Sequence, residues 1–330
     1  MESTFTSTLL TWYERHAREL PWRGIDDAYG IWLSEIILQQ TRVQQGRDYW
    51  LRFMRRFPHV EELAAASEDE VLRLWQGLGY YSRARNLHTA ARQIVAMGGF
   101  PRTLEGIRSL KGVGEYTAAA VGSMAFGLPV AAVDGNVYRV LARHFGIDTP
   151  IHSTAGKQTF TELAQTLLPA DQPGAFNQAM MDFGSLQCTP QSPHCLLCPL
   201  AETCVALHEG RVEALPVKLH HTKVTERRLT YLYISCQGQV AIHRRGEGDI
   251  WQGLWELVPF IPEGLKDIQL LCKDVKHVLT HRVLFADFYF VESSMKPSLP
   301  EDYLWVQETE LDDYGKPRLI ERLLEMVPRI

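Results

Sequence analysis

The sequence predicts a two-part protein, in which a mostly α-helical region is followed by a smaller mixed α/β domain. Residues 29–207 carry apolar residues at helical spacing, punctuated by prolines and glycines, and few stretches there alternate like strands. Beyond residue 228 the chain changes to short runs rich in β-branched and aromatic residues, separated by polar, glycine or proline stretches. The length of 330 residues also favours two domains over one.

The composition change sets the expected boundaries. We expect a helical region over residues 1–212, a polar and basic linker over 213–228 and the second domain over 229–330. The expected strands of that domain are LTYLYISC, QVAIHR, LWELVPF, LFADFYFV and YLWV. A closing helix in PRLIERLLEMV has apolar residues at helical spacing and should pack on the sheet.

Composition and charge indicate a soluble protein inside the cell. The chain is 45% hydrophobic and 22% charged, and charged residues interrupt its first twenty positions, so no apolar run of signal-peptide or membrane-spanning type is present there. We therefore expect no membrane partner. The formal net charge of -5 arises in the tail, because residues 229–330 hold 11 Lys and Arg against 16 Asp and Glu, and 23 of each precede them. A neutral front region can bind nucleic acid through a local basic stripe or helix N-termini, so net charge does not decide the partner.

The stretch LKGVGEYTAAAV, residues 110–121, lies between two helical segments and has the form of a helix-hairpin-helix. Gly112 and Gly114 lack a Cβ atom, so the turn is expected to reach positive φ and to let backbone amides approach a phosphate. A second helix beginning near Glu115 would add its N-terminal dipole. An ordinary αα-hairpin with glycines at its bend remains the alternative on spacing alone.

Asp134 follows in VDGNVYRVLARHF, directly before a glycine and a new helix, where capping is the commoner role for an aspartate. The hairpin and this string together resemble the signature of the endonuclease III superfamily of base-excision DNA glycosylases. The resemblance implies that Asp134 is catalytic. Members that also cut the strand place a lysine nucleophile where this sequence has Tyr116, and a phenol cannot form a Schiff base, so no strong lyase step is expected.

Glu35 lies in IWLSEIIL, a helix that is apolar on nearly every side. Desolvation raises the pKa of a carboxyl and can keep a proton available near neutral pH, as a general acid requires. A buried ion pair with an arginine such as Arg42 is the alternative. The longer string WLSEIILQQTRV resembles the motif WLSEVMLQQTQV of the MutY-type adenine DNA glycosylases, whereas strand-cutting relatives have a different residue at the glutamate.

This resemblance implies roles for several side chains. Glu35 would protonate adenine at N7, while the Asp134 carboxylate stabilises an oxocarbenium-like sugar. Tyr116 and Asn136 would lie beside Asp134 and orient or hydrogen-bond its carboxylate. Tyr80 would act as an aromatic wedge that lowers the cost of flipping adenine out of the duplex. The other residues implied to contact DNA are Gln39, Gln40, Gly112 and Gly114.

Four of the six cysteines form the pattern Cys188-x6-Cys195-x2-Cys198-x5-Cys204. Such clustering favours metal ligation over a disulfide framework, and four thiolates suit a 4Fe-4S cluster. Zinc is the main rival, although structural zinc sites usually pair two CxxC-like knuckles and this run has only one. The spacing resembles the cluster motif of the glycosylase family, which implies a structural 4Fe-4S cluster in the loop 188–204, with His194 facing DNA phosphates.

Residues 229–330 resemble the MutT-like (Nudix) C-terminal domain of the MutY-type family. A working Nudix hydrolase needs a glutamate-rich helix of REXXEE type, which this sequence lacks, so recognition rather than hydrolysis is expected. In the family a Phe-Ser-His loop contacts the 8-oxoguanine opposite adenine, and the matching residues here are Leu279, Thr280 and His281. Thr280 keeps the hydroxyl, whereas Leu279 lacks the aromatic ring. Trp251 and Trp255 are expected to pack on the sheet.

The resulting hypothesis is an enzyme of base excision repair, a monofunctional DNA glycosylase that removes adenine mispaired with 8-oxoguanine or guanine. Its expected partner is double-stranded DNA with such mispairs, and a cytoplasmic, bacterial, monomeric protein is expected. Three alternatives stay open: an endonuclease III-like enzyme that excises oxidised pyrimidines, a non-catalytic helix-hairpin-helix DNA binder, and nucleotide hydrolysis by the tail domain.

Overall fold

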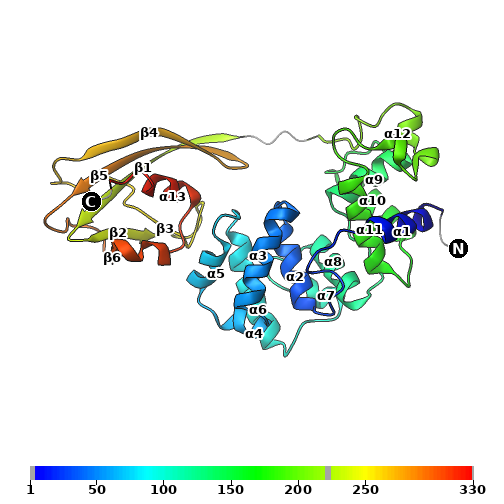
Figure 1. Ribbon diagram of the computed structural model, residues 1–330, viewed down its shortest axis with the longest axis horizontal. Helices are drawn as coiled ribbons and strands as arrows, with labels where there is room; N and C mark the ends of the chain where they lie inside the picture. The colour runs from blue at the N-terminus through cyan, green and yellow to red at the C-terminus, as the bar shows by residue number, and fades with distance from the viewer. Residues whose placement is uncertain (1–3, 220–223, 329–330) are drawn as a thin grey trace. The chain divides into compact units, whose positions relative to one another are not determined.

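The computed structural model describes residues 4–219 and 224–328. The chain divides into two compact units, each of which combines segments that are distant in the sequence. Unit 1 consists of Met1–Ala64 and Thr89–His220, and unit 2 consists of Ala65–His88 and His221–Ile330. The boundary therefore crosses one helix, α6 (Ser82–Ala96), which is labelled in Figure 1. Helix α5 (Glu68–Trp75) and the first half of α6 belong to unit 2.

Unit 1 is helical, as the sequence predicts. Its helices, besides the second half of α6, are α1 (Thr4–His16), α2 (Ala28–Leu38), α3 (Val43–Arg56), α4 (Val60–Ala65), α7 (Leu104–Arg108), α8 (Glu115–Phe126), α9 (Gly135–Phe145), α10 (Thr154–Leu167), α11 (Pro173–Leu186) and α12 (Val205–His208). A core that includes Trp12, Phe160, Phe176 and Phe183 joins α1, α10 and α11. The N-cap of helix α2 is Asp27, whose side chain accepts hydrogen bonds from the Tyr29 and Gly30 amides, and every residue from Tyr29 to Ile37 is buried. Such a helix can hold a polar side chain away from water.

The expected hairpin consists of α7, a turn over residues 109–114 and α8, which begins at Glu115 as predicted. Gly112 adopts a φ of +77°, the left-handed region that favours glycine. The expectation of positive φ is wrong for Gly114, whose φ is -91°, because this residue is the extended N-cap of α8. The small residues of α8 are buried, among them Ala118, Ala119 and Ala120, so neighbouring helices can approach closely.

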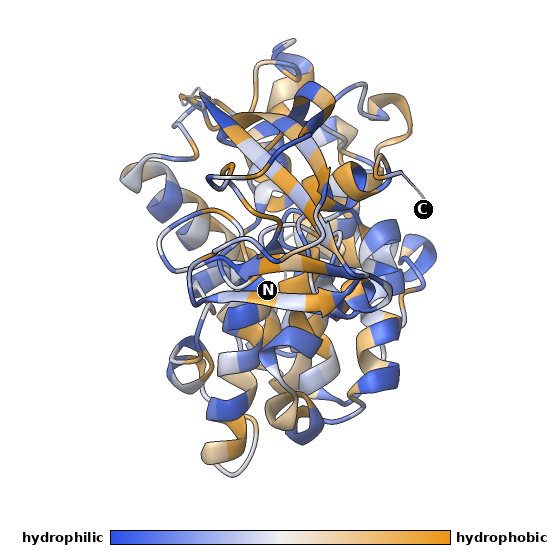
Figure 2. Ribbon diagram, turned by 90° about the vertical axis from the view of Figure 1, so that its left-hand side faces the viewer, coloured by the Kyte–Doolittle hydropathy of each residue, from blue (hydrophilic) through white to orange (hydrophobic). Residues whose placement is uncertain are grey.

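Unit 2 is built on one mixed sheet. Its strands are β1 (Thr225–Cys236), β2 (Gln239–Arg244), β3 (Trp255–Glu256), β4 (Gln269–Val278), β5 (Arg282–Glu292) and β6 (Tyr303–Gln307). The strand order is β3-β2-β1-β5-β4, with β6 also paired to β2, and β1 runs parallel to β5 while the other pairs are antiparallel. The closing helix α13 (Arg318–Leu324) is confirmed, and Leu319, Ile320 and Leu323 enter the same core as Tyr231 and Phe288. Hydrophobic and hydrophilic residues occur along the same strands and helices in Figure 2.

Three parts of this domain differ from the sequence-based expectation. Strand β4 was not predicted, because it is an edge strand whose residues are mostly exposed and polar. The stretch LWELVPF forms only the two-residue β3 and an isolated bridge at Val258. Strand β1 begins at Thr225, inside the segment 213–228 expected to be a linker, because its polar start pairs with β5 from Thr225 opposite Arg282.

The first residues of that segment also have tertiary contacts, since Leu215 is buried in the unit 1 core. No helix in the described ranges is long and apolar enough to cross a membrane.

Candidate active site

A cavity of about 600 Å³ opens in unit 1 between α2, α8, α9, α11 and the segment that follows α1. Its lining contains six of the residues singled out from the sequence, namely Glu35, Gln39, Gln40, Tyr116, Asp134 and Asn136. These residues come from three helices and one loop that are up to 101 positions apart in the sequence, between Glu35 and Asn136. The cavity also contains Arg18, Arg23 and Met181, which the sequence analysis did not identify.

Glu35 is buried in α2, with 7% of its surface exposed. Burial raises the pKa of its carboxyl to about 7, and the charge of Asp134 adds to this, while the Tyr116 hydrogen bond and the charge of Arg23 oppose it. The expected desolvation is therefore confirmed. Among the described residues Glu35 forms no ion pair with Arg42, and the arginine whose charge acts on Glu35 is Arg23. A carboxyl with this pKa exchanges its proton near neutral pH.

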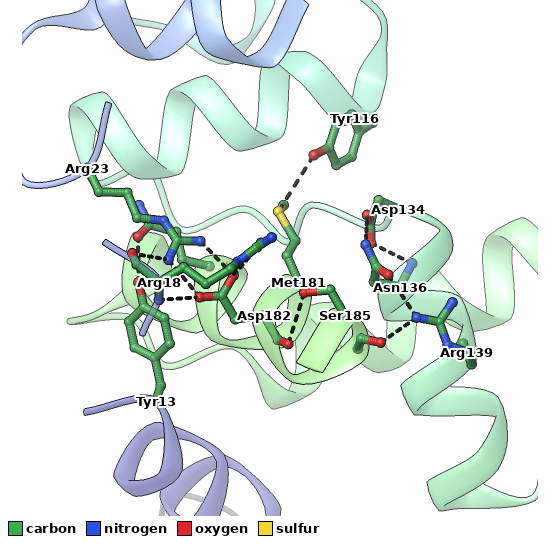
Figure 3. A network of polar contacts seen from close by, with 12 residues as sticks. Tyr13, Arg18, Arg23, Tyr116, Asp134, Asn136, Arg139, Met181, Asp182 and Ser185 are labelled. Carbon is green, nitrogen blue, oxygen red and sulfur yellow. Dashed lines mark hydrogen bonds and ion pairs between the residues drawn. The ribbon is translucent and has the colours of Figure 1, made fainter. Parts of the chain in front are cut away.

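Tyr116 lies in the first turn of α8, and its hydroxyl donates to Glu35 Oε2 at 2.9 Å. The expectation that Tyr116 hydrogen-bonds the Asp134 carboxylate is wrong in this respect, because the phenol reaches across to α2 instead. Burial and the nearby carboxylates of Glu35 and Asp134 raise the pKa of Tyr116 well above its usual range. The phenol therefore stays protonated and acts as a hydrogen-bond donor. Its hydroxyl also lies 3.6 Å from Met181 Sδ, as Figure 3 shows.

Asp134 is both the N-cap of α9 and a cavity residue. Its Oδ1 accepts hydrogen bonds from the amides of Asn136 at 2.9 Å and Val137 at 2.8 Å. Its Oδ2 accepts from the Asn136 side chain at 2.7 Å, which confirms the expected contact between these two residues (Figure 3). Arg139 in turn donates to Asn136 Oδ1 at 2.8 Å and so fixes the amide. Capping α9 and a chemical role are therefore compatible for Asp134, because the cap holds its carboxylate at the cavity wall.

A buried ion cluster supports one side of the cavity. Asp182 of α11 is fully buried and accepts from Arg18 Nε at 2.7 Å and from both Arg23 terminal nitrogens at 2.6 and 2.7 Å (Figure 3). Burial alone would raise the pKa of Asp182, but the hydrogen bonds from Arg23 and Arg18 hold it below its usual range. The cluster joins segments about 160 residues apart, so no local sequence motif predicts it. It fixes two cationic side chains in the cavity wall.

The remaining residues predicted at the front region fall into two groups. Gln39 and Gln40 follow α2 at the cavity rim, where Gln39 Nε2 donates to Thr117 Oγ1 at 3.3 Å and Gln40 is exposed with a φ of 58°. Gly112 and Gly114 are in the hairpin turn and do not line the cavity. A Cβ atom added at Gly114 would meet nothing within 4 Å, so this backbone is open to a ligand.

Unit 2 contains a second pocket, with a volume of about 540 Å³. Thr280 and His281, predicted to read the lesion, and Tyr80, predicted to be the aromatic wedge, line it together with Leu279. Tyr80 is 43% exposed, has a φ of 46°, and its hydroxyl is hydrogen-bonded to that of Thr280. Trp251, expected to pack on the sheet, contacts the domain core but also lines this pocket with a φ of 60°. Two aromatic residues with unfavourable backbone angles at one pocket are typical of functional loops.

The four clustered cysteines lie between the end of α11 and α12 and line one small apolar cavity. Arg143 of α9 donates to Cys188 Sγ at 3.4 Å, and burial raises the pKa of Cys198 to about 11. No group of three or more His, Cys, Asp or Glu side chains in the described ranges is placed to hold a metal ion. The four cysteines nevertheless line the same cavity, and thiolates are donors that both zinc and iron-sulfur clusters accept. His194, expected to face phosphates, is exposed but lines this cysteine cavity.

Two family models match the chain in the order of its two regions. Residues 33–166 match the model described as HhH-GPD superfamily base excision DNA repair protein, and residues 230–326 match that of a NUDIX domain. The first range contains Glu35, Tyr116 and Asp134, and the second contains Thr280 and His281. The predicted fold, a helical helix-hairpin-helix glycosylase region followed by a Nudix-like domain, is thereby confirmed.

Relatives of established name share much of the sequence. The chain is 30% identical over 341 residues to the adenine DNA glycosylase of Buchnera aphidicola subsp. Schizaphis graminum (strain Sg), with 98% of each chain covered. It is 44% identical over 228 residues to the adenine DNA glycosylase of Mus musculus, with 65% of this chain covered. That alignment covers 44% of the mouse protein, so the chain spans less than half the length of this relative.

Solved structures show the same fold for the helical region. A thermostable thymine-DNA glycosylase is 32% identical with a TM-score of 0.58, covering 62% of this chain and 95% of its own. A non-covalent endonuclease III–DNA complex is 22% identical with a TM-score of 0.54, covering 62% and 94%, which is a likeness of fold alone. Because both family models match in order and a relative is aligned over nearly its whole length, the chain belongs to the MutY-type adenine DNA glycosylase family.

Proposed function

We propose that this protein hydrolyses the N-glycosidic bond of adenine mispaired with 8-oxoguanine or guanine in double-stranded DNA. The observation that carries the proposal is the pair of carboxyl groups in the unit 1 cavity. Burial raises the pKa of Glu35 to about 7, while the Asp134 carboxylate is held in place by three hydrogen bonds that it accepts. One acid and one carboxylate in the same cavity are the requirement of glycoside hydrolysis. The names of the relatives supply the base, adenine.

In the proposed reaction Glu35 gives its proton to the adenine ring, so that the leaving base departs as a neutral molecule. The bond between the base nitrogen and the sugar carbon then breaks, and the electron pair of that bond goes to the base. Asp134 stabilises the positive charge that develops on the sugar, and water attacks the same carbon and releases one proton to the solvent, which leaves an abasic site. Tyr116 orients Glu35, and Asn136 orients Asp134.

The cavity favours a monofunctional enzyme. A lyase step needs an amine that attacks the sugar and forms a Schiff base. The position that carries lysine in strand-cutting relatives holds Tyr116, and the cavity lining contains no lysine among the residues that the structure describes. The cations of the cavity wall that Asp182 binds, Arg18 and Arg23, are guanidinium groups and cannot form that bond.

Recognition of the mispair is assigned to the second pocket. Tyr80, Thr280 and His281 offer an aromatic face, a hydroxyl and an imidazole within one recess, which suits an oxidised purine opposite the excised base. Leu279 offers a smaller apolar surface there than an aromatic ring. Gln39 and Gln40 are proposed to contact DNA at the rim of the unit 1 cavity, and Gly112 and Gly114 to present backbone amides to a phosphate.

A 4Fe-4S cluster is proposed for the cysteine cavity, held by Cys188, Cys195, Cys198 and Cys204. All four thiols line one space, and the high pKa that burial gives Cys198 means that a compensating cation is needed to hold the thiolate. When bound, the cluster supplies a structural crosslink between the end of α11 and α12. Arg143 helps to place this loop, because it also donates to the carbonyl of Thr189 at 2.7 Å.

The proposal is tested with labelled duplexes that carry adenine or cytosine opposite 8-oxoguanine. Half of each sample is treated with hot alkali after incubation with the purified protein, because alkali cleaves an abasic site. Strand breakage only after alkali, and only at adenine, is the expected result. Breakage without alkali would establish the lyase alternative, and no breakage at all would leave a DNA-binding protein without this chemistry.

A further inference from the structure

The hydroxyl of Tyr116 has one hydrogen and two acceptors. Glu35 Oε2 lies 2.9 Å away on α2, and Met181 Sδ lies 3.6 Å away on α11, both within hydrogen-bond range for their elements. Figure 3 shows the methionine side chain reaching from α11 toward the ring of Tyr116. The hydroxyl donates to only one of these acceptors at a time, either the Glu35 oxygen or the Met181 sulfur.

We propose that Met181 is a positioning residue, whose sulfur accepts the Tyr116 hydrogen whenever Glu35 is protonated. This inference rests on the proposed function of Glu35 as the acid. When Glu35 is a carboxylate, it is the stronger acceptor and takes the hydrogen of Tyr116. When Glu35 is protonated at Oε2, that oxygen becomes a hydroxyl, which is a much weaker acceptor than a carboxylate oxygen, and its O–H turns toward a base. The phenol hydrogen can then turn to another acceptor inside the buried site. Met181 Sδ is that acceptor.

The proposal follows from the cost of a poorly paired buried hydroxyl. Burial that leaves a donor with only a weak acceptor costs free energy, and the site would avoid that cost by keeping Glu35 ionised. A sulfur within reach removes this bias and so favours the protonated form that general acid catalysis needs. A stronger acceptor at the position of Met181 would hold the Tyr116 hydrogen permanently. Tyr116 would then no longer donate to Glu35 in either protonation state. A thioether, a weak acceptor, suits an exchange between two states.

The other charged groups around Glu35 do not provide an alternative acceptor. Asp134 faces it from α9, where its oxygens accept from the Asn136 and Val137 amides and from the Asn136 side chain. Arg23 faces it from the segment before α2 and is a donor only, already bound to Asp182. Among the described contacts of the Tyr116 hydroxyl, Glu35 and Met181 are the two acceptors.

The direct test is the pKa of Glu35 in the protein without DNA. It is measured by ¹³C NMR of protein labelled at the glutamate side-chain carboxyls, with Glu35→Gln to assign the signal. Met181→Leu keeps the shape and removes the sulfur, and we expect it to lower the pKa of Glu35 by about 0.5, the scale of one weak hydrogen bond. Met124→Leu is the matched control, since Met124 lines the same cavity but makes no hydrogen bond to Tyr116. An unchanged or raised pKa in Met181→Leu, or an equal shift in Met124→Leu, overturns the proposal.

A second background isolates the hydrogen bond from packing. In Tyr116→Phe there is no hydrogen to accept, so adding Met181→Leu is expected to leave the pKa of Glu35 unchanged. A shift of the same size in that background would assign the effect to packing and contradict the proposal. Met181→Ile also lacks the sulfur and replaces Met181→Leu if that variant does not fold.

The catalytic consequence is read separately. Above the pKa, a fall of about 0.5 reduces the protonated fraction of Glu35 roughly threefold, so single-turnover adenine excision at pH 8 is expected to slow roughly threefold. Activity below the pKa should match the wild type. The NMR titration needs no activity, so a shifted pKa without any adenine excision would defeat the proposed function and leave the role of Met181 standing. Normal adenine excision by Met181→Leu with an unchanged pKa of Glu35 would overturn the role of Met181 and leave the proposed function standing.

Discussion

The two pockets of this protein are built in opposite ways. The unit 1 cavity takes its main side chains from helices, and Glu35 and Asp134 are fixed by burial, a helix cap and short hydrogen bonds. The unit 2 pocket takes Tyr80, Thr280 and His281 from loops, and Tyr80 is exposed with a positive φ. The unit 1 cavity controls the protonation of Glu35, which requires exclusion of water and fixed side chains. The second presents surface to a ligand, which needs access.

This difference predicts which property of the enzyme a mutation in each pocket should change. Changes in the unit 1 cavity should alter the rate of bond cleavage and the pH dependence, because they change charge at the reacting atoms. Changes in the unit 2 pocket should alter DNA affinity and the discrimination between mispairs. Their effects should be smaller, because each contact there contributes less free energy than a buried charge.

The largest effect is expected for Glu35→Gln. Loss of the acid should slow adenine excision by about 10² to 10⁴, measured in single-turnover assays with excess protein. The dissociation constant for an uncleaved mispair duplex should stay within about threefold of the wild type, because the rim residues are untouched. The exposed Glu61→Gln in α4 is the control and should leave both quantities unchanged. A large loss of DNA affinity in Glu35→Gln would mean that the cavity reads the substrate as well as cleaving it.

The same variant should be more stable than the wild type at alkaline pH. The folded-state pKa of Glu35 is about 7 against an ordinary 4.5, so stability from this group is present below pH 4.5 and is lost as pH rises to about 7. Glu35→Gln lacks this loss. Its free energy of unfolding in urea at pH 8 should exceed that of the wild type by up to about 3 kcal/mol, with no difference at pH 4. An equal difference at both pH values would place its cause outside titration.

Asp134→Asn should come next. Asparagine is as good an N-cap as aspartate, so α9 should remain capped and the thermal midpoint should change little. The loss of negative charge should slow excision by about 10² to 10³, the scale seen when one electrostatic contact to a transition state is removed. A normal rate with a normal fold would show that Asp134 is only a cap.

Asp182→Asn should act mainly on stability. It leaves the partly buried Arg18 and Arg23 without their carboxylate, at a cost of about 3 kcal/mol in unfolding experiments at pH 7. Because the folded-state pKa of Asp182 is lowered, the stability that it provides is present above about pH 4 and is lost as pH falls. The difference from the wild type should therefore shrink in acid. A difference that does not shrink as pH falls below the ordinary pKa of aspartate would point to lost packing instead.

The smallest effects are expected in unit 2. Thr280→Ala removes the hydroxyl that bonds Tyr80 and should reduce the preference for 8-oxoguanine over guanine about threefold to tenfold, the value of one hydrogen bond. Leu279→Phe should raise that preference by a similar factor, because a ring adds stacking surface. Both are measured as ratios of dissociation constants on uncleaved duplexes, and the cleavage rate of bound adenine should not change.

The sequence was most informative where the relevant contacts are local. The burial of Glu35 follows from the apolar residues around it in α2, and the Asp134 cap follows from Asp-Gly-Asn at the start of α9. The partner of Tyr116 could not be predicted, because α8 and α2 approach each other only through tertiary packing. The Asp182 cluster was missed because its members are about 160 residues apart. Strand β4 was missed because an exposed edge strand carries no alternating apolar pattern.

The division between the two pockets is tested most directly by the pH dependence of adenine excision on two duplexes. Single-turnover rates are measured from pH 5 to 9 with adenine opposite 8-oxoguanine and with adenine opposite guanine. We expect both rates to fall as pH rises through a common midpoint near 7, while their ratio stays constant. Midpoints that differ between the two duplexes, or rates that rise with pH, would contradict the assignment of the acid to Glu35 and of lesion reading to a separate pocket.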